Sequence, residues 1–165
     1  MSKLIDADRW APLIGNLIIA FGYIESITHD CLRKWTTPTT YKHIKSMPLS
    51  QRLDFTIDLL REQNISESIK RSFIEDLLQI HKITKIRNTV AHSPLLLEII
   101  GDETDSLREV ICHNTNAHRS IEFDQLASAS TEAIAIVDRF YDYLAAIRLA
   151  NLEFSIPREW NGLGR

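Results

Sequence analysis

The longest predicted central helix lies at residues 64–92 and reads NISESIKRSFIEDLLQIHKITKIRNTVAH. The four residues from Asn64 have capping-box form, so the helix is expected to begin there. Pro94 disfavours helical backbone at Ser93, which ends the helix at about His92. Apolar side chains recur along it at three- and four-residue steps and predict a buried stripe. That stripe contains Phe73, Ile74, Leu77, Leu78, Ile80 and Ile83.

Three further helices are predicted around this one, at about residues 8–35, 49–63 and 124–151. Residues 36–48, which are bounded by two prolines and rich in threonine, are expected to form a loop. The last helix is expected to bury Leu126, Ala133, Ile134, Val137, Phe140, Tyr141, Leu144 and Ile147. Short connections between the helices predict an all-α, four- to five-helix up-and-down bundle.

A small β-hairpin insertion is predicted after the third helix. Apolar residues at 95–100 and 107–112 flank an acidic turn at 101–105. Periodicity alone also allows a helix for such short runs. His113 and His118 follow, but no second pair stands at zinc-finger spacing, so an exposed polar loop and no metal site are expected there.

Length and composition predict a single domain over residues 1–165, with 151–165 as a carboxyl-terminal tail. A chain of 165 residues with 44% hydrophobic content can bury about 70% of its unfolded surface. Cys31 and Cys112 are its two cysteines, and acidic residues interrupt any basic leader, which favours the cytoplasm. The most apolar run, 11–24, is shorter than the roughly 20 residues that span a bilayer, so no membrane is expected. A phosphate-binding Gly-rich loop is lacking, and no cofactor is expected.

Charge is unevenly distributed along the chain. Residues 1–97 carry 13 Lys and Arg against 10 Asp and Glu, and residues 98–165 carry 6 against 12. The basic half offers candidate RNA-binding side chains: Arg33, Lys34, Lys82 and Lys85. Ordinary solvated basic surface explains the same residues equally well.

The sequence Arg87-Asn88-Thr89-Val90-Ala91-His92 places a permanent cation, an amide and an imidazole at the end of the central helix. Helical geometry spreads these three side chains over about 140°, with Asn88 between the other two, so they can converge on one phosphate. Arg87 falls on the apolar side and therefore needs a partner. Glu25, which lies within the apolar stripe of the first helix, is the predicted partner and has a structural role.

This Arg-Asn-x-x-x-His element, at the end of a long amphipathic helix in an all-helical chain, resembles the HEPN superfamily. The resemblance implies a homodimer whose two protomers join their Arg and His residues in one cleft. That cleft cuts RNA at the ribose 2′-hydroxyl without a metal ion, and Arg87, Asn88 and His92 are the matching positions. A toxin–antitoxin or defence setting, with an antitoxin or nucleotidyltransferase partner, is also implied. Some family ribonucleases carry Tyr two residues after the His, where this chain has Pro94.

Each of these residues also has a plainer interpretation. His92 either acts as a general acid and base or caps the carbonyl groups of its own helix. Arg87 either holds phosphate oxygens or makes a structural ion pair, and Asn88 orients His92 or the phosphate. The competing function is therefore a non-catalytic HEPN-like module for dimerisation or interaction.

Overall fold

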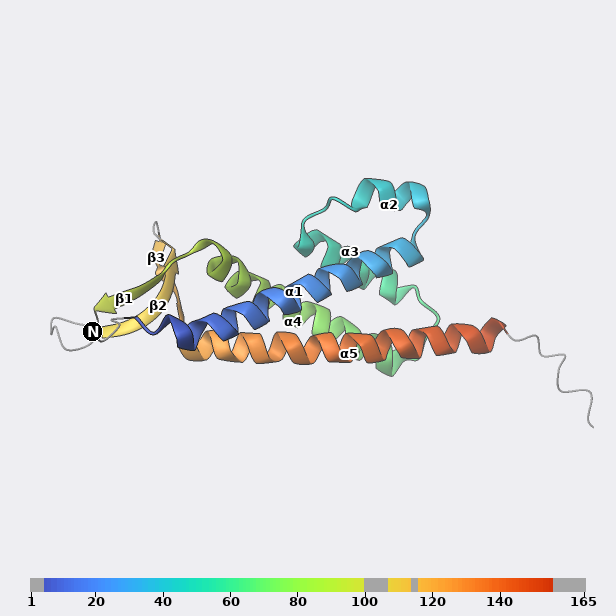
Figure 1. Ribbon diagram of the computed structural model, residues 1–165. Helices are drawn as coiled ribbons and strands as arrows, with labels where there is room; N and C mark the ends of the chain where they lie inside the picture. Colours follow the sequence, from blue (N-terminus) through green and yellow to red (C-terminus); the bar gives the residue numbers. More distant parts are fainter. Residues whose placement is uncertain (1–4, 100–106, 114–115, 156–165) are drawn as a thin grey trace, which may run out of the picture.

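The computed structural model describes residues 5–99, 107–113 and 116–155. Helices predominate in the described residues, and four of them form an elongated bundle (Figure 1). Their bounds are α1 Ala7–Trp35, α3 Leu49–Arg61, α4 Glu67–His92 and α5 Phe123–Ser155. A three-stranded sheet lies at the end of the bundle where α1 and α5 begin (Figure 1). The predicted helical bundle is therefore confirmed, with the small sheet as an addition.

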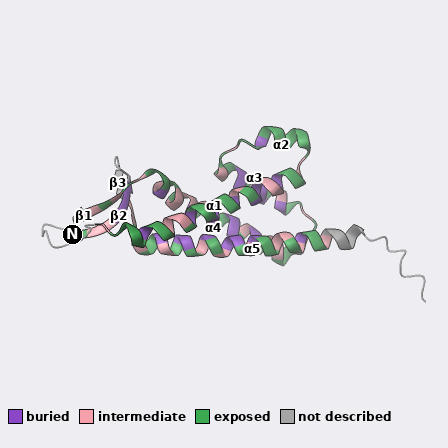
Figure 2. Cartoon of the chain, in the orientation of Figure 1, coloured by how far each residue is buried: buried purple, intermediate pink, exposed green. Residues whose placement is uncertain are grey.

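A short helix, α2 (Pro38–Ile44), stands where the sequence predicted a loop. The Thr37 hydroxyl accepts a hydrogen bond from the Thr40 backbone N–H, and Pro38 occupies the first helical turn, where its missing N–H costs nothing. The loop prediction was wrong because two turns are too few to show a periodic apolar pattern. Most of α2 is exposed (Figure 2).

The sheet consists of β1 (Leu95–Ile99), β2 (Leu107–His113) and β3 (Asn116–Glu122), paired antiparallel in that order. The β1–β2 pair is the predicted hairpin, and its predicted acidic turn lies outside the described residues. The polar loop predicted around His113 and His118 was wrong, because β3 is held by pairing with β2 rather than by an apolar pattern of its own. No group of His, Cys, Asp or Glu suited to a metal ion occurs in the part of the chain that the structure describes.

One glutamate ties the sheet to the start of α1. Glu109 of β2 accepts hydrogen bonds from the Trp10 indole N–H at 2.7 Å and from the Asp6 backbone N–H at 2.5 Å. Trp10 is buried and meets the Phe123 ring edge-on, with 5.2 Å between ring centroids. These contacts fix the sheet against the junction of α1 and α5.

The core runs along the inward faces of the four long helices, but three predicted core residues are not in it. Leu78, Ile134 and Tyr141 are exposed. α5 also continues to Ser155, past its predicted end at 151, and residues 156–165 of the predicted tail lie outside the described residues. By length and composition α1 could cross a membrane, and a third of its most apolar window is buried inside the protein.

Asp76 joins α4 to α5. Its carboxylate receives two hydrogen bonds from the Arg139 guanidinium, both at 2.8 Å, and one from the Tyr143 hydroxyl at 3.0 Å. Arg139 also donates to Glu132 at 3.1 Å. The Asp76 side chain is almost buried, whereas Arg139 and Glu132 are partly exposed.

Replacing Arg139 with methionine should lower the free energy of unfolding by about 2 kcal/mol or more, because it leaves the Asp76 carboxylate buried without its cation. Glu132→Gln removes a partly exposed contact to the same guanidinium and should cost about 0.5 kcal/mol or less. Urea unfolding followed by circular dichroism measures both. Equal losses in the two variants would contradict this assignment.

Candidate functional site

Arg87 of α4 makes the contact that the sequence predicted. Its Nη2 donates to Glu25 Oε1 at 3.3 Å, and its Nη1 donates to Asn88 Oδ1 at 3.1 Å. The guanidinium carbon lies 5.7 Å from the centre of the Phe21 ring on α1. The Arg87 and Glu25 side chains are 29% and 37% exposed. The predicted pair is therefore present, but it is half-buried rather than fully buried.

A second arginine shares the same carboxylate. Arg52 of α3 is only 8% exposed, and its Nη2 lies 3.5 Å from Glu25 Oε2. Its Nη1 also donates to the Met47 carbonyl at 3.2 Å and contacts His29 Nε2 at 2.9 Å. No partner for Arg52 was predicted from the sequence. One sequence signal of its burial was its position one helical turn before Thr56, next to the apolar stripe of α3.

His29 continues this set of contacts to α2. Because Arg52 donates to Nε2, the imidazole is neutral and carries its proton on Nδ1, which lies 3.4 Å from the Tyr41 hydroxyl. Burial, and then the Arg52 charge, lower the pKa of His29 below 6.5, while Glu25 and Asp30 oppose the shift. We call Tyr41, His29, Arg52, Glu25 and Arg87 the Glu25 cluster.

The Glu25 cluster holds two guanidinium groups against one carboxylate. The cluster therefore carries one positive charge in excess when His29 is neutral. The Nε atoms of Arg52 and Arg87 are buried and have no hydrogen-bond partner. Excess cationic charge beside a partly exposed Arg87 is suited to an anionic ligand such as a phosphate.

Asn88 and His92 lie on the solvent side of α4. Both are exposed, and His92 is the last residue of the helix. Lys85, at three residues before Asn88 and seven before His92, shares their face. Arg87 instead points toward α1, about 140° around the helix from His92. Within one chain, the structure joins Arg87 to Asn88 and Glu25 and leaves His92 apart from them.

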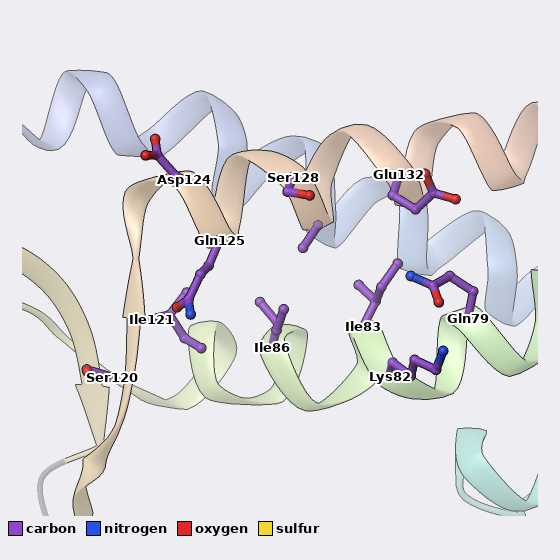
Figure 3. A pocket seen from close by; sticks show the side chains of 11 residues that line it. Gln79, Lys82, Ile83, Ile86, Ser120, Ile121, Asp124, Gln125, Ser128 and Glu132 are labelled. Carbon is purple, nitrogen blue, oxygen red and sulfur yellow. The ribbon is translucent and has the colours of Figure 1, made fainter.

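The predicted RNA-binding lysines of α4, Lys82 and Lys85, are both exposed and lie three residues apart, so they are neighbours on the helix surface. Lys82 lines a hollow of about 630 Å³ between α4, α5 and β3, together with Gln79, Ile86, Gln125 and Glu132 (Figure 3). Gln79 and Ile86 lie well round the helix from Asn88 and His92, whereas Lys82 lies between that pair of lining residues and Lys85. Lys85 adjoins the motif directly, and Lys82 lies one turn before Lys85.

The two basic residues predicted on the first helix lie in its last turn. Arg33 and Lys34 are both exposed, and Arg33 pairs with Asp30 at 2.7 Å. Their helix also carries Glu25, more than two turns earlier. They extend the positive surface beyond the Glu25 cluster without contacting the motif.

No protein-family model, curated protein or solved structure matches this chain. The resemblance to the HEPN superfamily therefore rests on the motif residues and their place in the bundle.

Glu25→Gln should lower the free energy of unfolding by about 1–2 kcal/mol, because the buried Arg52 loses its carboxylate while water still reaches Arg87. Asp30→Asn, which removes the exposed pair with Arg33, is the control and should cost about 0.5 kcal/mol or less. Chemical denaturation of both variants tests this. A Glu25→Gln protein as stable as the wild type would show that Arg52 does not need Glu25.

Lowering the pH should destabilise the protein through His29. As the pH falls below 6.5 the unfolded chain protonates His29 while the native imidazole stays neutral, so unfolding is favoured until the lowered native pKa is reached. Above pH 6.5 the contribution is fully present. Stability measured between pH 7.5 and 5 should fall less in His29→Gln than in the wild type. His43→Gln, at an exposed histidine of α2, should keep the wild-type slope.

Proposed function

We propose that this protein is a metal-independent endoribonuclease of HEPN type, whose active site is formed by two copies of the chain. The observation that carries the proposal is the arrangement of the motif. Glu25 and Asn88 hold the half-buried Arg87 in position, and His92 is exposed one turn further along α4. An oriented cation from one copy and an exposed imidazole from another are the groups that phosphodiester cleavage without a metal requires.

The proposed reaction is an attack of the ribose 2′-oxygen on the adjacent phosphorus. The neutral His92 of one protomer accepts the 2′-hydroxyl proton, and the protonated His92 of the other donates to the 5′-oxygen as the P–O5′ bond breaks. The products are a 2′,3′-cyclic phosphate and a 5′-hydroxyl. Two imidazoles in opposite protonation states are needed, which explains the need for two copies.

Arg87 has the role of stabilising the charge that builds on the phosphoryl oxygens. Its planar guanidinium can hold two oxygens at once, and Glu25 restricts its rotation before RNA arrives. The excess positive charge of the Glu25 cluster strengthens this effect. Lys85, on the same face as Asn88 and His92, is placed to contact a neighbouring phosphate.

One observation favours the competing function, a non-catalytic interaction module. Arg87 already has Glu25 and Asn88 as partners, and Glu25 is shared with the buried Arg52. In that interpretation the Glu25 cluster only fixes three helices together. A toxin or defence role, with an antitoxin or nucleotidyltransferase partner, belongs to the ribonuclease proposal and not to this one.

Purified protein should cut single-stranded RNA in EDTA with a bell-shaped pH profile and leave cyclic phosphate ends. His92→Ala should lower the rate by about 10²-fold or more, because it removes both acid and base. His43→Ala, which removes an exposed histidine outside the motif, is the matched control and should cut at close to the wild-type rate.

Arg87→Lys separates the two functions further. It keeps a cation near Glu25 but loses the two-pronged hold on phosphate, so cleavage should fall while the thermal midpoint changes little. Wild-type protein that binds RNA but never cuts it between pH 5 and 9 would favour the interaction module.

A further inference from the structure

The outward face of α1 is uncharged and apolar for most of its length. No charged side chain occurs from Trp10 to Ile24. Ile19 is 60% exposed and Tyr23 50% exposed, and Ile18 is also exposed. α5 exposes Ile134 beside them and Tyr141 two turns later, the two α5 residues that the sequence wrongly placed in the core. A groove of about 220 Å³ runs between the two helices, lined in part by Ile19, Tyr23 and Ile134 and by the polar side chains of Asn16 and Asp138.

Two glycines mark the centre of this face. Gly15 and Gly22 are seven residues apart and so lie on one side of α1. A methyl group at either position would meet nothing within 4 Å in the protein. Glycine weakens a helix relative to alanine, and nothing within the described chain requires its small size here. A bare backbone flanked by exposed isoleucines permits the close approach of another helix.

The spacing on this face is self-complementary. If a second α1 lies antiparallel across it, with a two-fold axis between Ile18 and Ile19, then Gly15 of each copy faces Gly22 of the other. The same axis sets Ala11 opposite Ser26 and Ile18 opposite Ile19. A patch that matches itself under a two-fold rotation is what an isologous dimer requires.

Charges at the two ends of α1 favour the same orientation. Asp6, Asp8 and Arg9 give the amino-terminal end a net charge of −1, and Asp30, Arg33 and Lys34 give the carboxyl-terminal end a net charge of +1. An antiparallel copy brings acidic ends to basic ends, whereas a parallel copy would bring like charges together.

We propose that two copies of this chain pair through the α1 face formed by Ala11, Gly15, Ile18, Ile19, Gly22 and Ser26. Along the length of α1, the motif lies level with the axis of this pairing. Arg87 lies beside Phe21 and Glu25, and α4 runs opposite to α1 (Figure 1). His92, five residues later, therefore lies about 7.5 Å nearer the start of α1, level with Ile18 and the axis. This last point rests on the proposed ribonuclease function, but the dimer itself does not.

The dimer is tested by analytical ultracentrifugation at up to about 100 µM, far above a micromolar dissociation constant. The wild type should sediment as a dimer. Gly22→Leu should raise the dissociation constant about tenfold or more with unchanged helical circular dichroism, because the protomer has open space at that position. Leu78→Gln, at an exposed apolar residue of α4, is the control and should leave the dimer intact.

A cysteine at the axis tests the geometry. Ile19→Cys should form a covalent dimer under mild oxidation, since the native Cys31 and Cys112 are buried, and Leu78→Cys should not. A monomeric wild type, or a dimer that tolerates Gly22→Leu and does not crosslink through residue 19, overturns the proposal. A dimer that crosslinks at residue 19 but cuts no RNA supports this interface and contradicts the ribonuclease. RNA cleavage by a protein that tolerates Gly22→Leu and does not crosslink through residue 19 contradicts this interface and supports the ribonuclease.

Discussion

The cost of removing a guanidinium from water is the constraint on which the site depends. Arg52 is almost fully buried and needs a carboxylate nearby, and that carboxylate is Glu25. Because Glu25 lies on α1, Arg52 on α3 and Arg87 on α4, a single acidic side chain fixes the relative positions of three helices. The orientation of Arg87 follows from this arrangement and not from its own helix alone.

Long periodic segments made the bundle predictable from the sequence, and short or polar segments did not. Capping residues and apolar spacing located α4 to within a few residues of its observed ends. The seven-residue α2 is held by Thr37 and Pro38, and β3 by its pairing with β2. Neither the capping of α2 nor the strand pairing of β3 leaves a repeating apolar pattern in the sequence. Periodicity also shows that a face is apolar without showing what covers it, which is why Ile134 and Tyr141 were placed inside.

The candidate site was predictable where a local rule demanded a partner. A charge on an apolar face needs an opposite charge, and that rule linked Glu25 to Arg87 across 62 positions of sequence. The same rule did not predict the contact between Arg52 and His29, because that contact depends on how α1 and α3 pack. A basic residue at the edge of an apolar stripe is equally compatible with solvent.

The divergence of Arg87 and His92 around α4 decides what a single chain can do. Arg87 points inward to Glu25, and His92 stands on the outer surface about 140° away. A single phosphate held by Arg87 of one copy is therefore poorly placed for His92 of that same copy. Chemistry that uses both side chains needs the imidazole of a second protomer, whereas a purely structural Arg87 does not.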